Sequence, residues 1–247
     1  MLKHTINPTL LNLGPFEIRY YGIMYVIGFL FVMWYGKRAI REGKLKLTEK
    51  EYDDILGLLV LALIAGARLG YALFYNPAYF IENPLKIFAV WEGGLSFHGG
   101  FAGLLIAGWW ITKKKGLKVL QFADILIVPL ALANALGRVG NFINGELYGT
   151  ATNLPWGVIF PGVSEPRHPT QLYEAGYNLI IFAILWKLKD KEGHQGKLFG
   201  LFCMLYSVFR FLVEFIKDLP VYGPLTMGQW LNIPLFALGV WLYSKNR

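Results

Sequence analysis

The amino-acid sequence predicts an all-α, polytopic membrane protein with seven transmembrane helices, its N-terminus outside the cell and its C-terminus in the cytoplasm. Three observations predict this fold class: an apolar composition, seven long apolar segments, and basic residues concentrated in alternate connections. Of the 247 residues, 55% are hydrophobic and 16% are charged, and the mean hydropathy is +0.43. Typical soluble domains have about 25% charged residues, and one of this length could not bury so much apolar surface. We therefore treat residues 1–247 as a single integral-membrane domain.

The same composition excludes several other classes. A disordered chain needs low hydrophobicity, and Cys203 has no second cysteine with which to form a disulfide. A transmembrane β-barrel would have short alternating segments instead of long continuous ones. The four histidines are far apart and lack metal-ligand spacing, and the sequence contains no glycine-rich nucleotide motif. We expect no metal and no cofactor.

The seven apolar segments are each close to the roughly 20 residues needed to cross the hydrocarbon core. The first is not a cleavable signal peptide, because a neutral-to-acidic stretch precedes it and Lys37 and Arg38 follow it. The fourth is the weakest, because Pro129 and Asn134 interrupt it, although neighbouring helices can satisfy the freed backbone groups. The segments are Ile18–Gly36, Ile55–Tyr75, Leu95–Thr112, Phe122–Leu136, Thr170–Leu188, Leu198–Ile216 and Gly228–Ser244.

The distribution of the +8 net charge predicts the orientation. Sixteen Lys and Arg residues lie on one side, in residues 37–54, 113–118, 187–197 and the C-terminal tail, and six lie on the other. The richer side is cytoplasmic by the positive-inside rule, and seven crossings then place the N-terminus outside. These basic segments are interpreted as topology signals and contacts to anionic membrane lipids. We expect no nucleic-acid partner, because the charge is divided among separate segments.

This orientation places polar and ionisable side chains from six spans at one depth, near the outer leaflet. Scattered structural polar residues would show no such preference for one side. The side chains lie at the outer ends of spans or in the outward-facing loops 76–94 and 137–169. The candidate site residues among them are Tyr21, His98, Arg138, Asn141, Glu146, His168, Tyr206, Arg210 and Glu214.

The segment Gly137-Arg-Val-Gly-Asn-Phe-Ile-Asn-Gly-Glu146 has the highest density of such residues. Its glycines allow another element to approach closely. Arg138 offers a planar guanidinium that suits a phosphate. Asn141 can donate hydrogen bonds to ester or phosphate oxygens, and Glu146 can hold Arg138 in place. The alternative is a glycine-rich turn in which an Arg138–Glu146 pair only ties down a helix end.

Arg210 lies within the sixth span, where an arginine at mid-bilayer costs about 2.5–3.5 kcal/mol. Glu214 follows one helical turn later, so both side chains share a face with Tyr206. A pair with Arg before Glu contributes at most a few tenths of a kcal/mol and does not offset that cost. The sequence therefore predicts a negatively charged ligand for Arg210 or a partner on another span.

The two outer histidines each allow two interpretations. His98 opens the third span, where the helix N-terminus disfavours a cationic imidazole. A neutral His98 can act as a base or donate a hydrogen bond, or it can be an ordinary interface residue. His168 precedes a proline at the start of the fifth span, which favours loop anchoring or capping over direct chemistry.

Arg68 and Cys203 are interpreted as structural residues. Arg68 is either part of a second ligand site or a partner for Glu174 or Asp124, and the structural role is favoured. Cys203, in the apolar sixth span, is interpreted as a small packed hydrophobic residue.

Outward-facing arginines fit two functional classes, an enzyme acting on an anionic lipid and an outward-facing anion or phospholipid transporter. Transporters often contain paired interrupted spans from an inverted repeat, and here only the fourth span is interrupted. Polar residues that continued toward the cytoplasmic side would favour transport, and the inner halves of spans one, three, five and seven lack them. The polar cluster also disfavours a purely structural scaffold.

Four motifs in this order resemble those of the bacterial prolipoprotein diacylglyceryl transferases. The resemblance extends from Arg19-Tyr-Tyr-Gly22 to Met227-Gly-Gln229, nearly the whole chain, and the motif around Arg138 is the most specific. The motifs are Phe97-His-Gly-Gly100, Gly137-Arg-Val-Gly-Asn-Phe-Ile-Asn-Gly-Glu146, Arg167-His-Pro-Thr-Gln-Leu-Tyr-Glu174 and Tyr206-x-x-x-Arg210-x-x-x-Glu214.

The resemblance implies a multi-pass enzyme of the bacterial cytoplasmic (inner) membrane with its active site near the outer leaflet. It would transfer the diacylglyceryl group of phosphatidylglycerol to the lipobox cysteine of a prolipoprotein signal peptide, forming a thioether and releasing glycerol 1-phosphate. On this basis we expect His98, Arg138 and Arg210 to be catalytic. The residues expected to bind substrate are Tyr21, Arg138, Asn141, Glu146, Gly149, His168, Tyr206 and Glu214.

Overall fold

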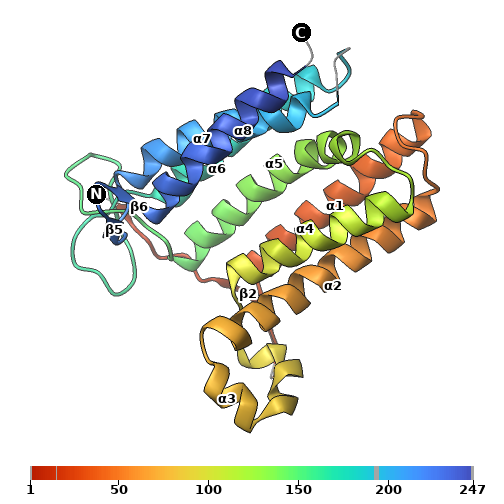
Figure 1. Ribbon diagram of the computed structural model, residues 1–247. Coiled ribbons are helices and arrows are strands. Elements are labelled where there is room, and N and C mark those ends of the chain that lie inside the picture. Colours follow the sequence, from red (N-terminus) through yellow and green to blue (C-terminus); the bar gives the residue numbers. More distant parts are fainter. Residues whose placement is uncertain (1, 15, 192–194, 246–247) are drawn as a thin grey trace. The chain divides into compact units, whose positions relative to one another are not determined.

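The computed structural model, which describes residues 2–14, 16–191 and 195–245, is predominantly helical (Figure 1). The predicted all-α class is confirmed at this level. Each predicted apolar segment overlaps a helix of 18 to 26 residues. These helices are α1 (Tyr20–Arg41), α2 (Glu49–Phe74), α4 (Phe97–Lys114), α5 (Val119–Asn144), α6 (Thr170–Leu188), α7 (Lys197–Glu214) and α8 (Met227–Ser244). Among the described residues, α1, α2 and α5 are long and apolar enough to cross a membrane.

Short elements fill the connections between the long helices. The segment between α2 and α4 contains helix α3 (Pro77–Glu82) and two 3-10 turns, η1 (Pro84–Phe88) and η2 (Val90–Glu92). Strand β1 (Leu2–Lys3) pairs in parallel with β4 (Val158–Ile159). Two antiparallel pairs complete the set, β2 (Thr9–Leu13) with β3 (Phe16–Arg19), and β5 (Val221–Tyr222) with β6 (Leu225–Thr226).

The chain divides into two compact units, which are described separately. The larger unit consists of Met1–Tyr35 and Ala123–Arg247, and the smaller one of Gly36–Phe122. In the smaller unit, α2 and α4 pack side by side through glycines (Figure 1). A Cβ on Gly70 would lie 2.7 Å from the Cα of Gly99, and a Cβ on Gly66 would lie 3.0 Å from the Cα of Gly103. Because each glycine pair is spaced by four residues, one face of each helix allows backbone contact.

In the larger unit, α7 packs between its chain neighbours α6 and α8. The β5–β6 hairpin joins α7 to α8, and the two helices run antiparallel with Gly200 against Gly239. A Cβ on Gly200 would lie 2.9 Å from the carbonyl oxygen of Gly239. The carboxylate of Asp124 on α5 accepts hydrogen bonds from the backbone N–H groups of Gly196 and Phe199 at 2.6 and 2.8 Å, and thereby caps the start of α7.

The weakest of the seven predicted spans, the fourth, is helical throughout, and its proline is accommodated as the sequence allows. Helix α5 continues through Pro129 and ends only at Asn144. Close packing supports it there, since a Cβ on Gly28 of α1 would lie 3.0 Å from the Cβ of Ala133. Tertiary contact of this kind can outweigh the lost hydrogen bond of a single proline. The expected loop 137–169 therefore begins with two helical turns, and Arg138 lies on the helix.

Candidate functional site

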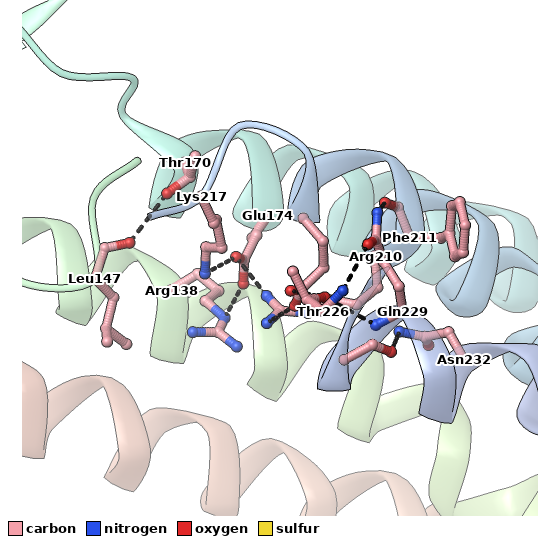
Figure 2. A network of polar contacts seen from close by, with 12 residues as sticks. Arg138, Leu147, Thr170, Glu174, Arg210, Phe211, Lys217, Thr226, Gln229 and Asn232 are labelled. Atoms are coloured by element: carbon pink, nitrogen blue, oxygen red, sulfur yellow. Dashed lines mark hydrogen bonds and ion pairs between the residues drawn. The ribbon is translucent and has the colours of Figure 1, made fainter. Parts of the chain in front are cut away.

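A single buried carboxylate collects three cationic side chains. Glu174 on α6 has no exposed surface. Its oxygens pair with Arg138 Nε at 2.6 Å, Arg210 Nη1 at 2.7 Å and Lys217 Nζ at 2.5 Å. Figure 2 shows these groups converging on Glu174 from α5, α7 and the segment after α7. Arg138 and Arg210, which belong to separate sequence motifs, are thus joined through one carboxylate.

The first turn of α6 fixes the position of Glu174. Thr170 Oγ1 donates a hydrogen bond to the carbonyl oxygen of Leu147 at 3.0 Å, and Gln171 Nε2 donates to that of Glu146 at 2.6 Å. Thr170 and Gln171 are buried. Residues 170, 171 and 174 share one side of a helix with 3.6 residues per turn. The side of α6 that binds the end of the α5 motif is therefore the side that carries the carboxylate.

A second buried carboxylate, Glu214, lies one turn after Arg210 on α7. It pairs with Nη2 of Arg210 and accepts a hydrogen bond from Thr226 Oγ1 at 2.7 Å. Gly228 leaves room for this carboxylate, because a Cβ on Gly228 would lie 2.5 Å from Glu214 Oε1 and would displace it. Both Nη atoms of Arg210 therefore contact carboxylates. The expected partner of Arg210 on another helix is Glu174.

These five charged groups have one positive formal charge in excess, because three cations face two carboxylates. The side chains of Arg138, Arg210 and Lys217 are 26%, 18% and 8% exposed. Electrostatic interactions are stronger at such partly dry sites than in water. Burial lowers the pKa of Lys217, which lies beyond the end of α7, and the contact with Glu174 opposes that shift. The cluster is suited to an anionic ligand.

Arg138 contacts Glu174 with only one part of its guanidinium. Nε faces the carboxylate, and Nη1 makes a long contact of 3.4 Å with Asn141 Oδ1. Within the part of the chain that the structure describes, no acceptor contacts Nη2. Figure 2 shows both Nη atoms pointing away from Glu174. This edge can offer two parallel hydrogen bonds to phosphate oxygens.

Glu146 does not hold Arg138, contrary to the expectation from the sequence. Its Oε1 accepts hydrogen bonds from Asn141 Nδ2 at 2.9 Å and from Asn144 Nδ2 at 3.0 Å. Glu174 takes the place that was assigned to Glu146. The reason is that α5 continues to Asn144, so that Glu146 lies at the helix end while Arg138 lies two turns earlier, where it faces α6.

Gly149 and His168 join the two ends of the long connection between α5 and α6. The N–H of Gly149 donates to the carbonyl oxygen of His168 at 2.9 Å, and the N–H of His168 donates to that of Thr150 at 3.0 Å. A Cβ on Gly149 would lie 2.7 Å from the Thr170 methyl group. The His168 ring contacts Tyr173 OH at 3.3 Å. These contacts agree with loop anchoring as the role of His168.

Tyr21 and Tyr206 supply aromatic surface in the larger unit. The Tyr206 ring stacks on Phe202 with centroids 5.4 Å apart. Tyr21 OH forms a hydrogen bond with Tyr25 OH at 2.9 Å. A Cβ on Gly140 would lie 2.8 Å from Tyr21 Cδ2, so this glycine of α5 makes room for the ring. Gly140 thus allows the close approach that was predicted, whereas a Cβ on Gly137 would meet only Tyr25, at 3.9 Å.

His98 belongs to the smaller unit, in the first turn of α4. Its side chain is exposed. Ser96 caps this turn, because its Oγ accepts a hydrogen bond from the N–H of Gly99 at 3.2 Å. Next to the imidazole is a cavity of about 310 Å³. Its lining residues are Phe74, Tyr75, Ser96, His98, Gly99 and Ala102.

Arg68 has a structural role, as favoured, but with different partners from those expected. Its guanidinium donates to backbone carbonyl oxygens of the segment before α4, including those of Lys86, Ile87 and Ala89 at 2.6, 3.1 and 3.0 Å. It also lies over the Phe80 ring, 5.0 Å from the centroid. Arg68 therefore organises the segment that leads to His98.

The sequence interpretation missed two members of the charged cluster. From the sequence, Glu174 belongs to the motif that opens the fifth span and is offered as a partner of Arg68, and Lys217 counts only among the six basic residues of the outer side. A carboxylate in an apolar helix is costly unless it is paired, and that signal pointed to a cationic partner for Glu174. Cys203 is buried, as predicted. The described residues contain no group of three or more His, Cys, Asp or Glu side chains that is suited to a metal ion, and His194 lies outside them.

The fold and the site define the chain as a helical membrane protein with a buried, cation-rich cluster. Residues 8–245 match the family described as prolipoprotein diacylglyceryl transferase. The chain belongs to this family.

Several bacterial proteins named phosphatidylglycerol–prolipoprotein diacylglyceryl transferase are similar over nearly their whole length. One from Geobacter sulfurreducens is 44% identical over 242 residues, covering 95% of this chain and 93% of the relative. One from Nitratidesulfovibrio vulgaris is 43% identical over 245 residues, covering 96% and 93%. A third, from Cupriavidus metallidurans, is 43% identical over 262 aligned positions, covering 100% and 97%.

Proposed function

We propose that this protein transfers the diacylglyceryl group of phosphatidylglycerol to the lipobox cysteine thiol of a prolipoprotein, the first step of lipoprotein maturation. The observation that carries this proposal is the charged cluster around Glu174, with its excess positive charge and the outward edge of Arg138. Membership of the family supplies the reaction. The names of the relatives supply the two substrates.

The reaction requires that charge accumulate on a phosphate. The cysteine sulfur attacks the glyceryl carbon that is bound to the phosphate oxygen. A C–S bond forms as that C–O bond breaks, and the bonding electron pair stays on the phosphate oxygen. The products are a thioether and glycerol 1-phosphate, and the phosphate gains one negative charge. Fixed cationic donors at that position stabilise the transition state more than the ground state.

Arg138 is proposed to bind the phosphate through its Nη edge. Arg210 supplies a second positive charge from α7 while its own Nη atoms stay on the two carboxylates. Asn141, at 3.4 Å from Nη1 of Arg138, limits the movement of that edge. Tyr21, Glu146, Gly149, His168, Tyr206 and Glu214 then act by shaping and supporting the substrate site.

His98 is proposed to take the proton from the cysteine thiol. Its exposed imidazole lies in the first turn of α4 beside a cavity, and imidazole is a common general base in proteins. A thiolate is the nucleophilic form of cysteine, so a nearby base raises the reactive fraction.

We infer that the chain crosses the bacterial inner membrane seven times, with the N-terminus outside and the active site near the outer leaflet. The seven helices that overlap the apolar segments support this topology, as do the basic segments at residues 37–54, 113–118 and 187–197. The thiol and the phosphate headgroup would then meet at lipid headgroup depth.

The decisive experiment is transfer by the purified protein in detergent. Phosphatidylglycerol labelled in its acyl chains is mixed with a lipobox peptide, and the labelled peptide and the released glycerol 1-phosphate are quantified. We expect equal amounts of both, and none with a peptide that has serine in place of the cysteine. Absence of transfer by folded protein, together with movement of labelled lipid or anion across vesicles, would favour the transporter instead.

A further inference from the structure

We propose that Glu174 is a positioning residue for the transfer reaction: it orients Arg138 toward the phosphate and, together with Lys217, sets the net charge that the phosphate meets. This inference rests on the proposed function and deepens it. Glu174 is fully buried, so it acts on the substrate only through the cations that it holds. It is therefore distinct from a catalytic residue.

The two carboxylate oxygens of Glu174 contact different cations, and this division sets the orientation of Arg138. Oε2 faces Arg138 Nε, whereas Oε1 faces Arg210 Nη1 and Lys217 Nζ. Arg138 meets Oε2 through Nε at 2.6 Å, and both of its Nη atoms point away from Glu174. Figure 2 shows this arrangement directly. An amide at position 174 would turn an N–H₂ group toward one of these cations and release it from its place.

Two buried side chains next to Glu174 fix the first turn of α6. Thr170 and Gln171 bind the carbonyl oxygens of Leu147 and Glu146 and so join the start of α6 to the end of the Arg138 motif. Rigid placement of donors before the charge develops is what stabilises a transition state. The carboxylate thus extends the fixed scaffold to the guanidinium.

Lys217 contributes to the net charge that the phosphate meets. The five groups together have an excess of one positive charge, which matches the single negative charge of a phosphodiester. Replacing Glu174 by glutamine raises the excess to two and strengthens binding of the doubly charged product. Removing the charge of Lys217 as well restores an excess of one but does not restore the contact at Arg138 Nε. Orientation and charge are therefore separable by mutation.

The experiment measures kcat and the inhibition constant of added glycerol 1-phosphate in the transfer assay. The variants are Glu174→Gln and the double variant Glu174→Gln with Lys217→Gln. The matched control is Glu165→Gln, which makes the same chemical change on an exposed carboxylate of the larger unit. Size-exclusion chromatography and thermal unfolding in detergent establish the folded fraction of each variant.

We expect Glu174→Gln to lower kcat by about tenfold or more, because a displaced Arg138 loses one charge-assisted hydrogen bond to the phosphate in the transition state. We expect its inhibition constant for glycerol 1-phosphate to fall by about tenfold, since one charge near the phosphate has been removed. In the double variant the inhibition constant returns toward the wild-type value while kcat stays low. A loss of folded protein alone would leave the inhibition constant unchanged.

Wild-type kcat in Glu174→Gln overturns the inference, and so does full recovery of kcat in the double variant, which would assign the effect to charge alone. An unchanged inhibition constant in Glu174→Gln overturns the charge argument. If Glu174→Gln does not fold, Lys217→Gln tests the same model. Its inhibition constant should rise by about tenfold, and its kcat should fall less than tenfold, because Glu174 still holds Arg138.

The same experiment distinguishes an error in the proposed function from an error in the role of Glu174. If the wild-type protein transfers no lipid, the proposed function is wrong. If the wild-type protein transfers lipid and is inhibited by glycerol 1-phosphate, but Glu174→Gln behaves as Glu165→Gln does, only the role of Glu174 is wrong.

Discussion

Replacing Arg138 by lysine keeps the positive charge and removes the guanidinium edge. Nε of Arg138 lies 2.6 Å from Glu174 Oε2 while the Nη atoms point away, so the arginine can serve the carboxylate and a phosphate at once. A lysine ammonium is a single nitrogen and a point charge. Beside a buried carboxylate it stays there, and the phosphate loses at least one charge-assisted bond of about 1.5–3 kcal/mol. We therefore expect kcat/KM to fall by about ten- to a hundredfold.

The assay is transfer of labelled diacylglycerol to a lipobox peptide by purified Arg138→Lys protein in detergent. The control is Arg38→Lys, because Arg38 forms an ion pair of similar length, 2.6 Å to Glu42, at a more exposed site. Arg138→Lys should stay folded, since Arg210 and Lys217 still neutralise Glu174. Near-normal turnover by Arg138→Lys would refute the argument from the guanidinium edge. Near-normal turnover by Arg138→Ala would remove the phosphate site and favour the transporter.

Three further predictions concern the topology, the source of the reacting thiol and the packing of α2. Reporter fusions at Lys115 and Asn83 should lie on opposite sides of the membrane, and labelling on the same side would contradict the seven-span topology. Cys203→Ala should leave transfer largely intact, because the reacting thiol belongs to the substrate. Loss of transfer by the folded variant would contradict that assignment of the thiol. Gly70→Ala should lower stability in thermal unfolding by about 1–3 kcal/mol, because its Cβ would lie 2.7 Å from the Gly99 backbone. Gly57→Ala on the same helix, where a Cβ meets nothing within 4 Å, is its control, and equal unfolding temperatures would refute the packing argument.

The helices follow from local properties of the sequence. Continuous apolar segments of nearly membrane length indicated each long helix. The glycines of the Arg138 motif indicated close approach of another element, which the contact of Gly140 with Tyr21 confirms. The motif residues Arg138, Asn141 and Arg210 were also identified from their type and depth. Each of these signals is carried by neighbouring residues, so a single sequence suffices to detect them.

The course of α5 depended on tertiary packing. Pro129 lacks a backbone donor, so local propensity disfavours a helix at this point, and the sequence made this span the weakest of the seven. The contact between Gly28 and Ala133 and the buried side chains of Val128 and Ala131 stabilise a continuous helix instead. Because α5 continues, Arg138 faces α6 and not the loop after it.

The sequence by itself indicated Arg138 and Arg210 as cations of the candidate site. Only the tertiary structure decided that Lys217 joins them and that Glu174 pairs with all three. Arg138 and Lys217 lie 36 residues before and 43 residues after Glu174 in the chain, yet the charged groups of both lie within 2.6 Å of its carboxylate. No spacing rule connects residues on different helices. Burial of the first turn of α6 places Glu174 where water cannot solvate it, and a buried carboxylate must then be paired. That physical requirement, met only in the folded chain, joins the separate motifs into one site.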